Sequence, residues 1–163
     1  MSTPLGSMIA VADDFVLHVL DFIDNPELPV VMNRLEKQMG EGSVPGQTPV
    51  LALVQKELYD YFEGTLKVFT LPLMPQGTVF QKRTWLALAK VPYGTTQSYA
   101  DIAVALAKPT AFRAVANANG VNPIAVAIPC HRIIKSSGDL CGYRGGIERK
   151  KWLLAHEKRN TLV

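Results

Sequence analysis

A cysteine and a histidine stand side by side at Cys130 and His131, directly after the apolar run at residues 124–128 and Pro129. A thiolate is a strong nucleophile, and an imidazole near a thiol can serve as the base that generates it. A thiol with an ordinary pKa of about 8.5 is only a few per cent ionised at neutral pH, so attack on a carbon centre needs such help. Arg132 adds a positive charge next to the pair. Cys130 is therefore the candidate nucleophile, with a small buried core residue as the alternative.

The element that must position the thiol is the run at residues 124–128, IAVAI, which is apolar and partly β-branched. Such a run predicts a buried strand or extended segment. Adjacent side chains of an extended segment point to opposite faces. A direct contact between Cys130 and His131 is therefore not expected, and communication between them would require a bridging water or a local bend.

Helix signals dominate the chain after residue 76. Two patterns of a capping residue followed three positions later by Gln or Asp, beginning at Thr78 and Ser98, predict capping boxes. The predicted helices span residues 79–90, residues 98 to about 107, and, capped by Thr110 and closed by Gly120, residues 111–119. The last two are short and joined by a tight turn, which makes them a candidate helix-turn-helix.

Charge is distributed unevenly along the chain. Residues 1–76 contain 4 Lys and Arg against 10 Asp and Glu, whereas residues 77–163 contain 13 against 4, so the halves carry formal charges of −6 and +9. The basic half favours a polyanionic partner, and nucleic acid is the first candidate. A solvated basic surface without a partner remains an equal alternative on charge alone.

The first half reads as a mixed α/β domain. Residues 8–12 and 15–20, separated by Asp13-Asp14, predict a β-hairpin. Thr48 followed by Pro49 predicts the start of a helix, which Gly64 ends. His18 is expected to be a strand residue without chemistry.

Composition excludes several classes of protein. No apolar run reaches the roughly 20 residues that a membrane helix needs, and no signal peptide is visible, so we expect a cytoplasmic protein without a membrane partner. Two cysteines, Cys130 and Cys141, are too few for a disulfide framework, and both are expected to be thiols. The first 129 residues contain no cysteine and one histidine, so no structural metal site is expected there.

The residues around Cys130 form a recognisable motif: Asn122-Pro123 followed by IAVAIPCHRII at residues 124–134 resembles the active-site signature of the O6-alkylguanine-DNA alkyltransferases. The resemblance covers about residues 78–157 in order and with fitting spacings, whereas the first half resembles the family only loosely. It includes the turn Val91-Pro92-Tyr93-Gly94, Ser98-Tyr99, Arg113-Ala114-Val115, Tyr143-Arg144-Gly145-Gly146, Lys150 and WLLAHE at residues 152–157.

The resemblance implies direct reversal of DNA damage, in which Cys130 accepts an alkyl group from O6 of guanine irreversibly and without a cofactor. His131, acting through water, would be the base, and Glu157 would orient and charge it. Asn122 would brace the active-site turn, and Tyr99 would donate a hydrogen bond to the flipped guanine. Tyr143 would form a wall of the pocket, and the backbone N–H of Arg144 would face O6. Lys150 would help to hold the loop that contains Tyr143 and Arg144.

The same resemblance implies how DNA is held. Arg113 would enter the base stack and fill the gap left by the flipped nucleotide, while the small residues Ala114, Ala118 and Gly120 would allow a close approach to the minor groove. Close packing of these small residues against a neighbouring helix is the alternative that the sequence leaves open. The implied partner is double-stranded DNA carrying O6-alkylguanine, bound by a monomer, with cooperativity left open. The implied fold is a small α/β, ribonuclease-H-like domain over residues 1–76 and a mostly helical helix-turn-helix domain over residues 77–163.

Two other functions compete with this interpretation. One is a lesion-sensing DNA-binding protein without chemistry, although relatives of that kind replace the acceptor cysteine. The other is a thiol hydrolase or oxidoreductase, but Cys130 and Cys141 are eleven residues apart rather than the usual three positions of a dithiol motif. Cys141 itself is expected to be a bystander.

Overall fold

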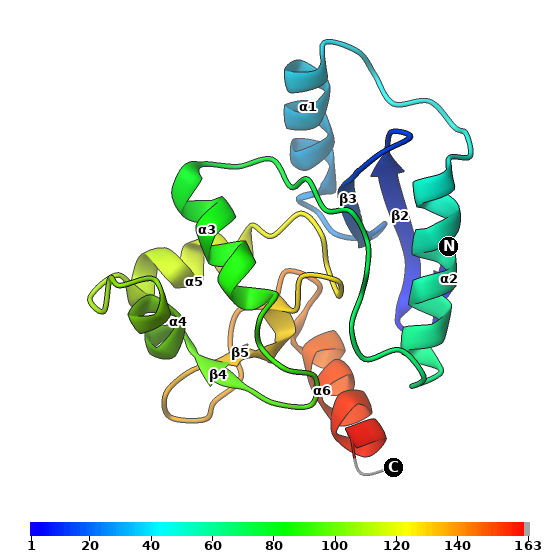
Figure 1. The fold of residues 1–163 in the computed structure, drawn as a ribbon. Coiled ribbons are helices and arrows are strands. Elements are labelled where there is room, and N and C mark those ends of the chain that lie inside the picture. The colour runs from blue at the N-terminus through cyan, green and yellow to red at the C-terminus, as the bar shows by residue number, and fades with distance from the viewer. Residues whose placement is uncertain (162–163) are drawn as a thin grey trace. The chain divides into compact units, whose positions relative to one another are not determined.

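The chain begins with antiparallel strands and continues mainly with helices (Figure 1). A computed structural model describes residues 1–161, and these fall into two units, Met1–Gln76 and a second that begins at Gly77. Strands and helices occur in both units, so the mixed α/β content expected from the sequence is confirmed.

The first unit is built on a sheet of three strands in the order β1 (Ser2–Thr3), β2 (Gly6–Ala12) and β3 (Leu17–Phe22). Strands β2 and β3 are antiparallel, which confirms the predicted hairpin. The second strand starts later than predicted, because Oδ1 of Asp13 accepts hydrogen bonds from the backbone N–H groups of Phe15 and Val16 and holds them in the turn. Every residue of β3 is buried.

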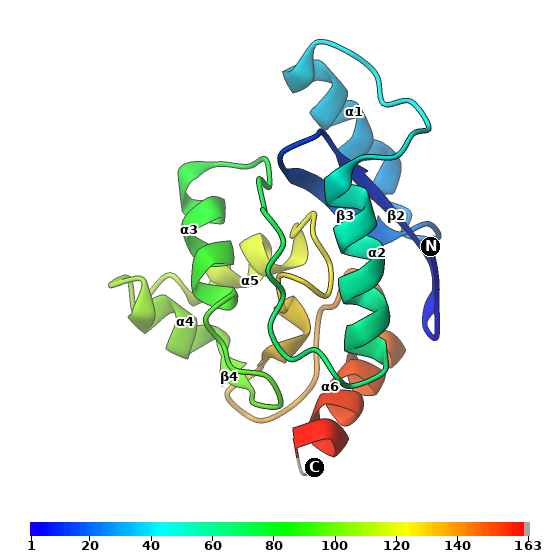
Figure 2. The same ribbon diagram turned by 45° about the vertical axis from the view of Figure 1, so that its right-hand side comes forward.

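Two helices complete this unit, α1 (Leu28–Met39) and α2 (Pro49–Phe62), and α2 packs against β2 (Figure 2). The hydroxyl of Thr48 accepts a hydrogen bond from the backbone N–H of Leu51 at 3.1 Å, so the predicted start of α2 is confirmed. Helix α1 was not predicted. It has no side-chain cap at its start and a single buried residue, Leu35, but Pro29 in its first turn and the left-handed Gly40 at its end are local helix signals that the prediction missed.

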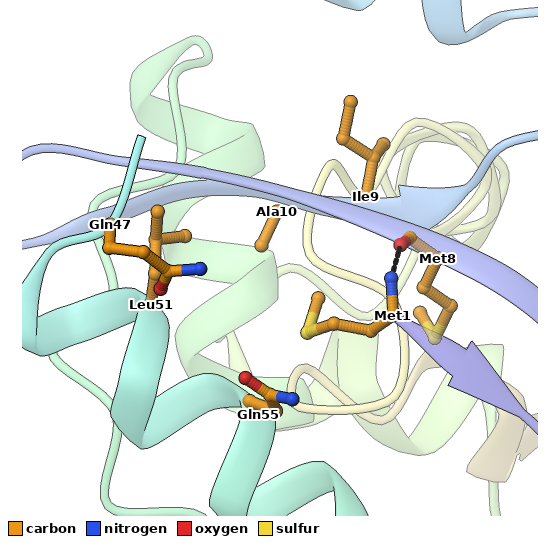
Figure 3. A pocket seen from close by; sticks show the side chains of 7 residues that line it. All are labelled: Met1, Met8, Ile9, Ala10, Gln47, Leu51 and Gln55. Carbon is orange, nitrogen blue, oxygen red and sulfur yellow. Dashed lines mark hydrogen bonds between the residues drawn. The ribbon is translucent and has the colours of Figure 1, made fainter. Parts of the chain in front are cut away.

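A shallow pocket of about 200 Å³ opens between β2 and α2 (Figure 3). The amino group of Met1 donates a hydrogen bond of 2.8 Å to the carbonyl of Met8 at its edge. The side chains that line it are apolar or uncharged, and they come from Met1, Met8, Ile9, Ala10, Gln47, Leu51 and Gln55. No nucleophilic or titratable side chain lines this pocket, so it offers no chemistry of the kind expected at Cys130.

The second unit contains the predicted helices as α3 (Val79–Leu88), α4 (Tyr99–Ala105) and α5 (Phe112–Gly120), followed by α6 (Ile147–Thr161). Both predicted capping boxes, at Thr78 and at Ser98, are present. The indole N–H of Trp85 donates to the carbonyl of Ala118 at 2.8 Å and joins α3 to α5. A short parallel pair, β4 (Gln97–Ser98) and β5 (Ile133–Ile134), ties the start of α4 to the chain that follows Cys130.

Two details of α5 correct the sequence prediction. Its N-cap is Ala111, which offers no side-chain hydrogen bond, so the assignment of Thr110 as the cap is wrong. The backbone N–H of Ala111 instead donates to the carbonyl of Lys108 at 2.8 Å, and this turn carries the chain into the helix. Gly120 is the last residue of the helix rather than a stop beyond it, because a glycine without a left-handed conformation does not break the helical hydrogen bonds.

Among residues 1–161 no helix is both long enough and apolar enough to cross a membrane. The same residues contain no group of three or more His, Cys, Asp or Glu side chains arranged to hold a metal ion.

Candidate active site

The apolar run before Cys130 is buried as expected, but it is a turn rather than a strand, so the predicted extended segment is wrong. The backbone N–H of Ile128 donates to the carbonyl of Ile124 at 3.1 Å, and Val126 has a left-handed φ of +69°. Cys130 then begins a 3₁₀ turn, Cys130–Arg132. An apolar, β-branched run predicts that the segment is buried, but it does not distinguish a buried turn from a buried strand.

Asn122 supplies the hydrogen bonds that a neighbouring strand would otherwise make to this turn. Its side-chain carbonyl accepts from the backbone N–H of Ile124 at 3.0 Å. Its amide nitrogen donates to the carbonyl of Ile128 at 2.9 Å and lies 3.2 Å from Sγ of Cys130. A single buried side chain therefore holds both the turn and the sulfur, which is the geometry that a bracing residue requires.

The imidazole of His131 is completely buried beside two charged groups. Its Nε2 lies 2.7 Å from Oε1 of Glu157, in the middle of α6. The guanidinium of Arg132 binds the same carboxylate, with Nε 2.9 Å from Oε2 and Nη2 3.0 Å from Oε1. The Glu157 carboxylate is thus fully buried but compensated from two sides.

These contacts decide whether the imidazole is charged and which of its nitrogens carries the proton. Burial would raise the pKa of Glu157, but hydrogen bonds and charges from His131 and Arg132 outweigh burial and hold that pKa far below its usual range. Burial lowers the pKa of His131, and the Glu157 carboxylate only partly opposes it. The imidazole is therefore neutral near pH 7, with its proton on Nε2 facing Glu157. Its Nδ1 makes no hydrogen bond to the described residues and keeps a lone pair that can accept a proton.

The free energy of unfolding is expected to fall as the pH is lowered from about 7 to about 4. Below about 6.5 the unfolded chain protonates His131 while the folded chain, with its lowered pKa, does not, and below about 4.3 the same holds for Glu157. Burial of the neutral imidazole thus destabilises the fold below about 6.5, and the Glu157 ion pair begins to lose its stabilising contribution only below about 4.3. Urea denaturation at several pH values measures the change, and a stability that is constant over this range would contradict the burial of this pair.

The turn at Val91–Gly94 is fixed by the same ionic group. Nη1 of Arg132 donates to the carbonyl of Val91 at 2.6 Å, and the backbone N–H of Gly94 donates to Oε2 of Glu157 at 3.0 Å. Gly94 has a φ of +72°, a conformation that favours glycine. Glu157 therefore joins the turn after α3 to the Cys130 turn as well as orienting the imidazole.

A second cluster surrounds the hydroxyl of Tyr99, at the start of α4. The hydroxyl donates to the carbonyl of Cys141 at 3.4 Å, and Sγ of Cys141 lies 3.7 Å from the same oxygen. Burial, and then the hydrogen bond with Cys141, raises the pKa of Tyr99, so the phenol stays protonated and can donate a hydrogen bond. The buried ammonium of Lys150 donates to the carbonyls of Ile133 at 2.5 Å and Cys141 at 2.9 Å, so it holds both ends of the loop between them.

The remaining pocket candidates lie on the loop before α6. Tyr143 is buried, and its ring meets the His131 ring edge to face, with 6.5 Å between the ring centres. Arg144 is the next residue and is half-buried. The structure thus brings Tyr143, the pocket wall that the resemblance implied, to the imidazole.

The expected DNA-contacting residues do not all share one face of α5. Arg113, Ala114 and Gly120 are exposed, whereas Ala118 is buried, with its carbonyl bonded to Trp85. Ala118 therefore packs against α3, and its assignment to a DNA-contacting surface is not supported. The small side chain at this position serves helix packing, while exposed Asn117 lies with the other three at helical spacing.

Three features of the site were missed from the sequence. Arg132 was noted only as a nearby charge, although it forms the ion pair with Glu157. The sequence indicates Gly94 only as part of a turn, and it predicts no role for Cys141, which contacts Tyr99 in the structure. A buried carboxylate flanked by histidine and arginine is a common arrangement, but nothing in the spacing pairs these residues before the fold is known.

Known proteins resemble this chain over most of its length. The model of the 6-O-methylguanine DNA methyltransferase DNA binding domain matches residues 79–159. A methylated-DNA–protein-cysteine methyltransferase of Methanosarcina barkeri is 39% identical over 98% of this chain and 96% of its own length. Its namesake from Salmonella typhimurium is 39% identical over 96% of this chain and 92% of its own length.

Solved structures show the same relationship. The crystal structure of Mycobacterium tuberculosis O6-methylguanine methyltransferase superposes with a TM-score of 0.83 and 39% identity, covering 98% of this chain and 91% of that chain. A structure of the Mycobacterium tuberculosis protein in complex with DNA gives a TM-score of 0.84 at 38% identity, with the same coverage. The chain therefore belongs to the methylated-DNA–protein-cysteine methyltransferase family.

Proposed function

We propose that this protein repairs DNA by direct reversal, transferring an alkyl group from O6 of guanine to Cys130 in a single, irreversible turnover. The observation that carries the proposal is a buried cysteine, braced by Asn122, one residue away from a neutral imidazole that an ionised Glu157 orients. Membership in the family supports the same reaction, because the relatives are named for transfer to a protein cysteine.

The reaction needs three proton and bond changes, each of which has a candidate residue. Nδ1 of His131 accepts the thiol proton through a water molecule, and the thiolate then attacks the alkyl carbon. The carbon–O6 bond breaks as the carbon–sulfur bond forms, and the electron pair leaves with the guanine. Tyr99 donates a hydrogen bond to the departing base and stabilises its charge. The thioether has no leaving group that restores the thiol, so the protein acts once.

Intact-mass measurement after incubation with a duplex carrying O6-methylguanine tests this proposal. The expected result is a gain of one methyl group per chain, located on the peptide that contains Cys130. Binding without a gain in mass would instead identify a lesion sensor, and sustained removal of more than one methyl per chain would identify a different thiol enzyme.

DNA is proposed to be held by α5 and the basic surface of the second unit. The relative from Mycobacterium tuberculosis has been solved with DNA, and exposed Arg113 lies at the start of α5 here. A base that reacts must leave the helical stack, and a planar guanidinium can replace the stacking that is lost. Arg113 is therefore proposed to fill the gap, with Ala114 and Gly120 allowing the helix to approach the minor groove.

Replacing Arg113 with alanine is expected to slow repair of duplex DNA by about tenfold or more, since the unstacking of a base costs a few kcal/mol. Reaction with the free base O6-benzylguanine should change little, because no base is flipped. Single-turnover rates on both substrates measure the ratio. Lys82→Ala, which removes an exposed cation from α3, is the matched control. Equal losses on duplex and free base in Arg113→Ala would remove the stacking role.

Several finer properties belong to the same proposal. The first unit is proposed to be ribonuclease-H-like, which its three-stranded antiparallel sheet followed by helices supports. The pocket roles of Tyr143, the backbone N–H of Arg144 and Lys150 toward guanine are part of it, as are a monomeric state and a location in the compartment that contains the DNA. Binding should weaken with added salt, as expected where phosphates are neutralised by Lys and Arg.

A further inference from the structure

We infer that Cys141 is a positioning residue for the transfer reaction: its thiol holds the hydroxyl of Tyr99 in the orientation from which that hydroxyl donates to the departing guanine. The inference rests on the proposed function of Cys130 and Tyr99. It gives a role to the second thiol of the chain, which the proposed alkyl transfer leaves without one.

Two contacts between the same residues support it. The Tyr99 hydroxyl has the Cys141 carbonyl at 3.4 Å as an acceptor and the Cys141 thiol at 3.7 Å as a donor. A phenolic oxygen can donate one hydrogen bond and accept others, so both contacts can exist together. The hydroxyl is thus held on both sides by one residue that is 42 positions away in the chain.

The arrangement leaves Tyr99 able to change partner. When a guanine arrives, the hydroxyl must turn its proton from the Cys141 carbonyl to the base. That carbonyl keeps a hydrogen bond, because the ammonium of Lys150 also donates to it at 2.9 Å. The thiol meanwhile still donates to the Tyr99 oxygen, which becomes more negative as its proton is shared with guanine. The exchange therefore leaves no buried polar group without a partner.

Substitutions at this position separate the thiol from the backbone carbonyl. Cys141→Ala keeps the carbonyl and removes only the donor, and we expect it to slow methyl transfer from a duplex by about three- to tenfold, the range of one modest hydrogen bond. Cys141→Ser restores a donor and should recover most of the rate. In a Tyr99→Phe background, Cys141→Ala should have no further effect, because the hydroxyl through which it acts is gone.

A second readout excludes a general structural defect. Alkylation of Cys130 by iodoacetamide needs the thiolate but has no guanine to release, so Cys141→Ala should leave its rate at Cys130 unchanged. Peptide mass spectrometry follows Cys130 separately from Cys141 in the wild-type protein. Circular dichroism melting checks that each variant is folded.

The outcomes are distinct. Slower guanine repair with unchanged iodoacetamide labelling, rescue by serine and no effect in the Tyr99→Phe background would support the role of Cys141. A Cys141→Ala variant that repairs DNA at the wild-type rate, or that loses both reactions equally, would overturn it. Failure of the wild-type protein to transfer any methyl group would instead overturn the proposed function.

Discussion

Cys130→Ser is expected to abolish alkyl transfer completely while leaving affinity for DNA within about twofold of wild type, because a hydroxyl keeps the size of the side chain but stays protonated. Serine retains a hydrogen-bonding atom for the amide of Asn122, which lies 3.2 Å from the sulfur. Mass spectrometry after incubation with an O6-methylguanine duplex measures transfer, and fluorescence anisotropy with the same duplex measures binding.

This variant separates chemistry from recognition. A methyl group found on any residue of Cys130→Ser would contradict the assignment of the acceptor. If the variant lost both DNA binding and alkyl transfer, the substitution would have disturbed the buried turn, and its melting temperature would be lowered as well. Unchanged binding together with no transfer is the combination that identifies Cys130 as the sole acceptor of the alkyl group.

Glu157→Gln is expected to lower the free energy of unfolding by about 3 kcal/mol and to slow transfer by at least tenfold, since removing one partner of a buried ion pair leaves the other charge uncompensated. Arg132 would keep its charge in a buried site, and an amide facing Nε2 of His131 no longer fixes which nitrogen carries the proton. Urea denaturation measures the first effect and single-turnover kinetics the second.

The same helix provides a matched control. Glu148 also lies on α6 and is paired, with Nζ of Lys151 2.8 Å from its Oε1, but its side chain is 81% exposed. Glu148→Gln should therefore change stability by less than about 1 kcal/mol, as is usual for exposed ion pairs. If both variants lost the same stability, burial of Glu157 would not be the cause.

The parts of the fold that were predicted correctly are those decided within a few residues. The capping boxes at Thr78 and Ser98 and the cap at Thr48 each join groups three positions apart, so the sequence contains the whole interaction. The failures are of another kind. The run at residues 124–128 folds as a turn whose hydrogen bonds come from the Asn122 side chain, and no capping pattern or β-branched run predicts that arrangement.

The candidate site shows the same division. Cys130 and His131 are adjacent and could be singled out by residue type alone, whereas a role for Glu157 and Tyr99 was expected only through resemblance to a family. The pairing of Arg132 with Glu157 spans 25 positions, and that of Tyr99 with Cys141 spans 42. No local rule joins residues at such separations, whereas α1 carried local signals, Pro29 and Gly40, that the prediction did not use.

Lys150 has a consequence for how the segment between Ile133 and Cys141 can diverge. Because one ammonium donates to the carbonyls at both of its ends, the segment is held closed by a residue outside it as well as by its own backbone hydrogen bonds between Lys135 and Asp139. Extra residues inserted within positions 135–140 would add only a slowly growing entropy of closure. This stretch can therefore vary in length and composition without displacing Tyr143 or α6.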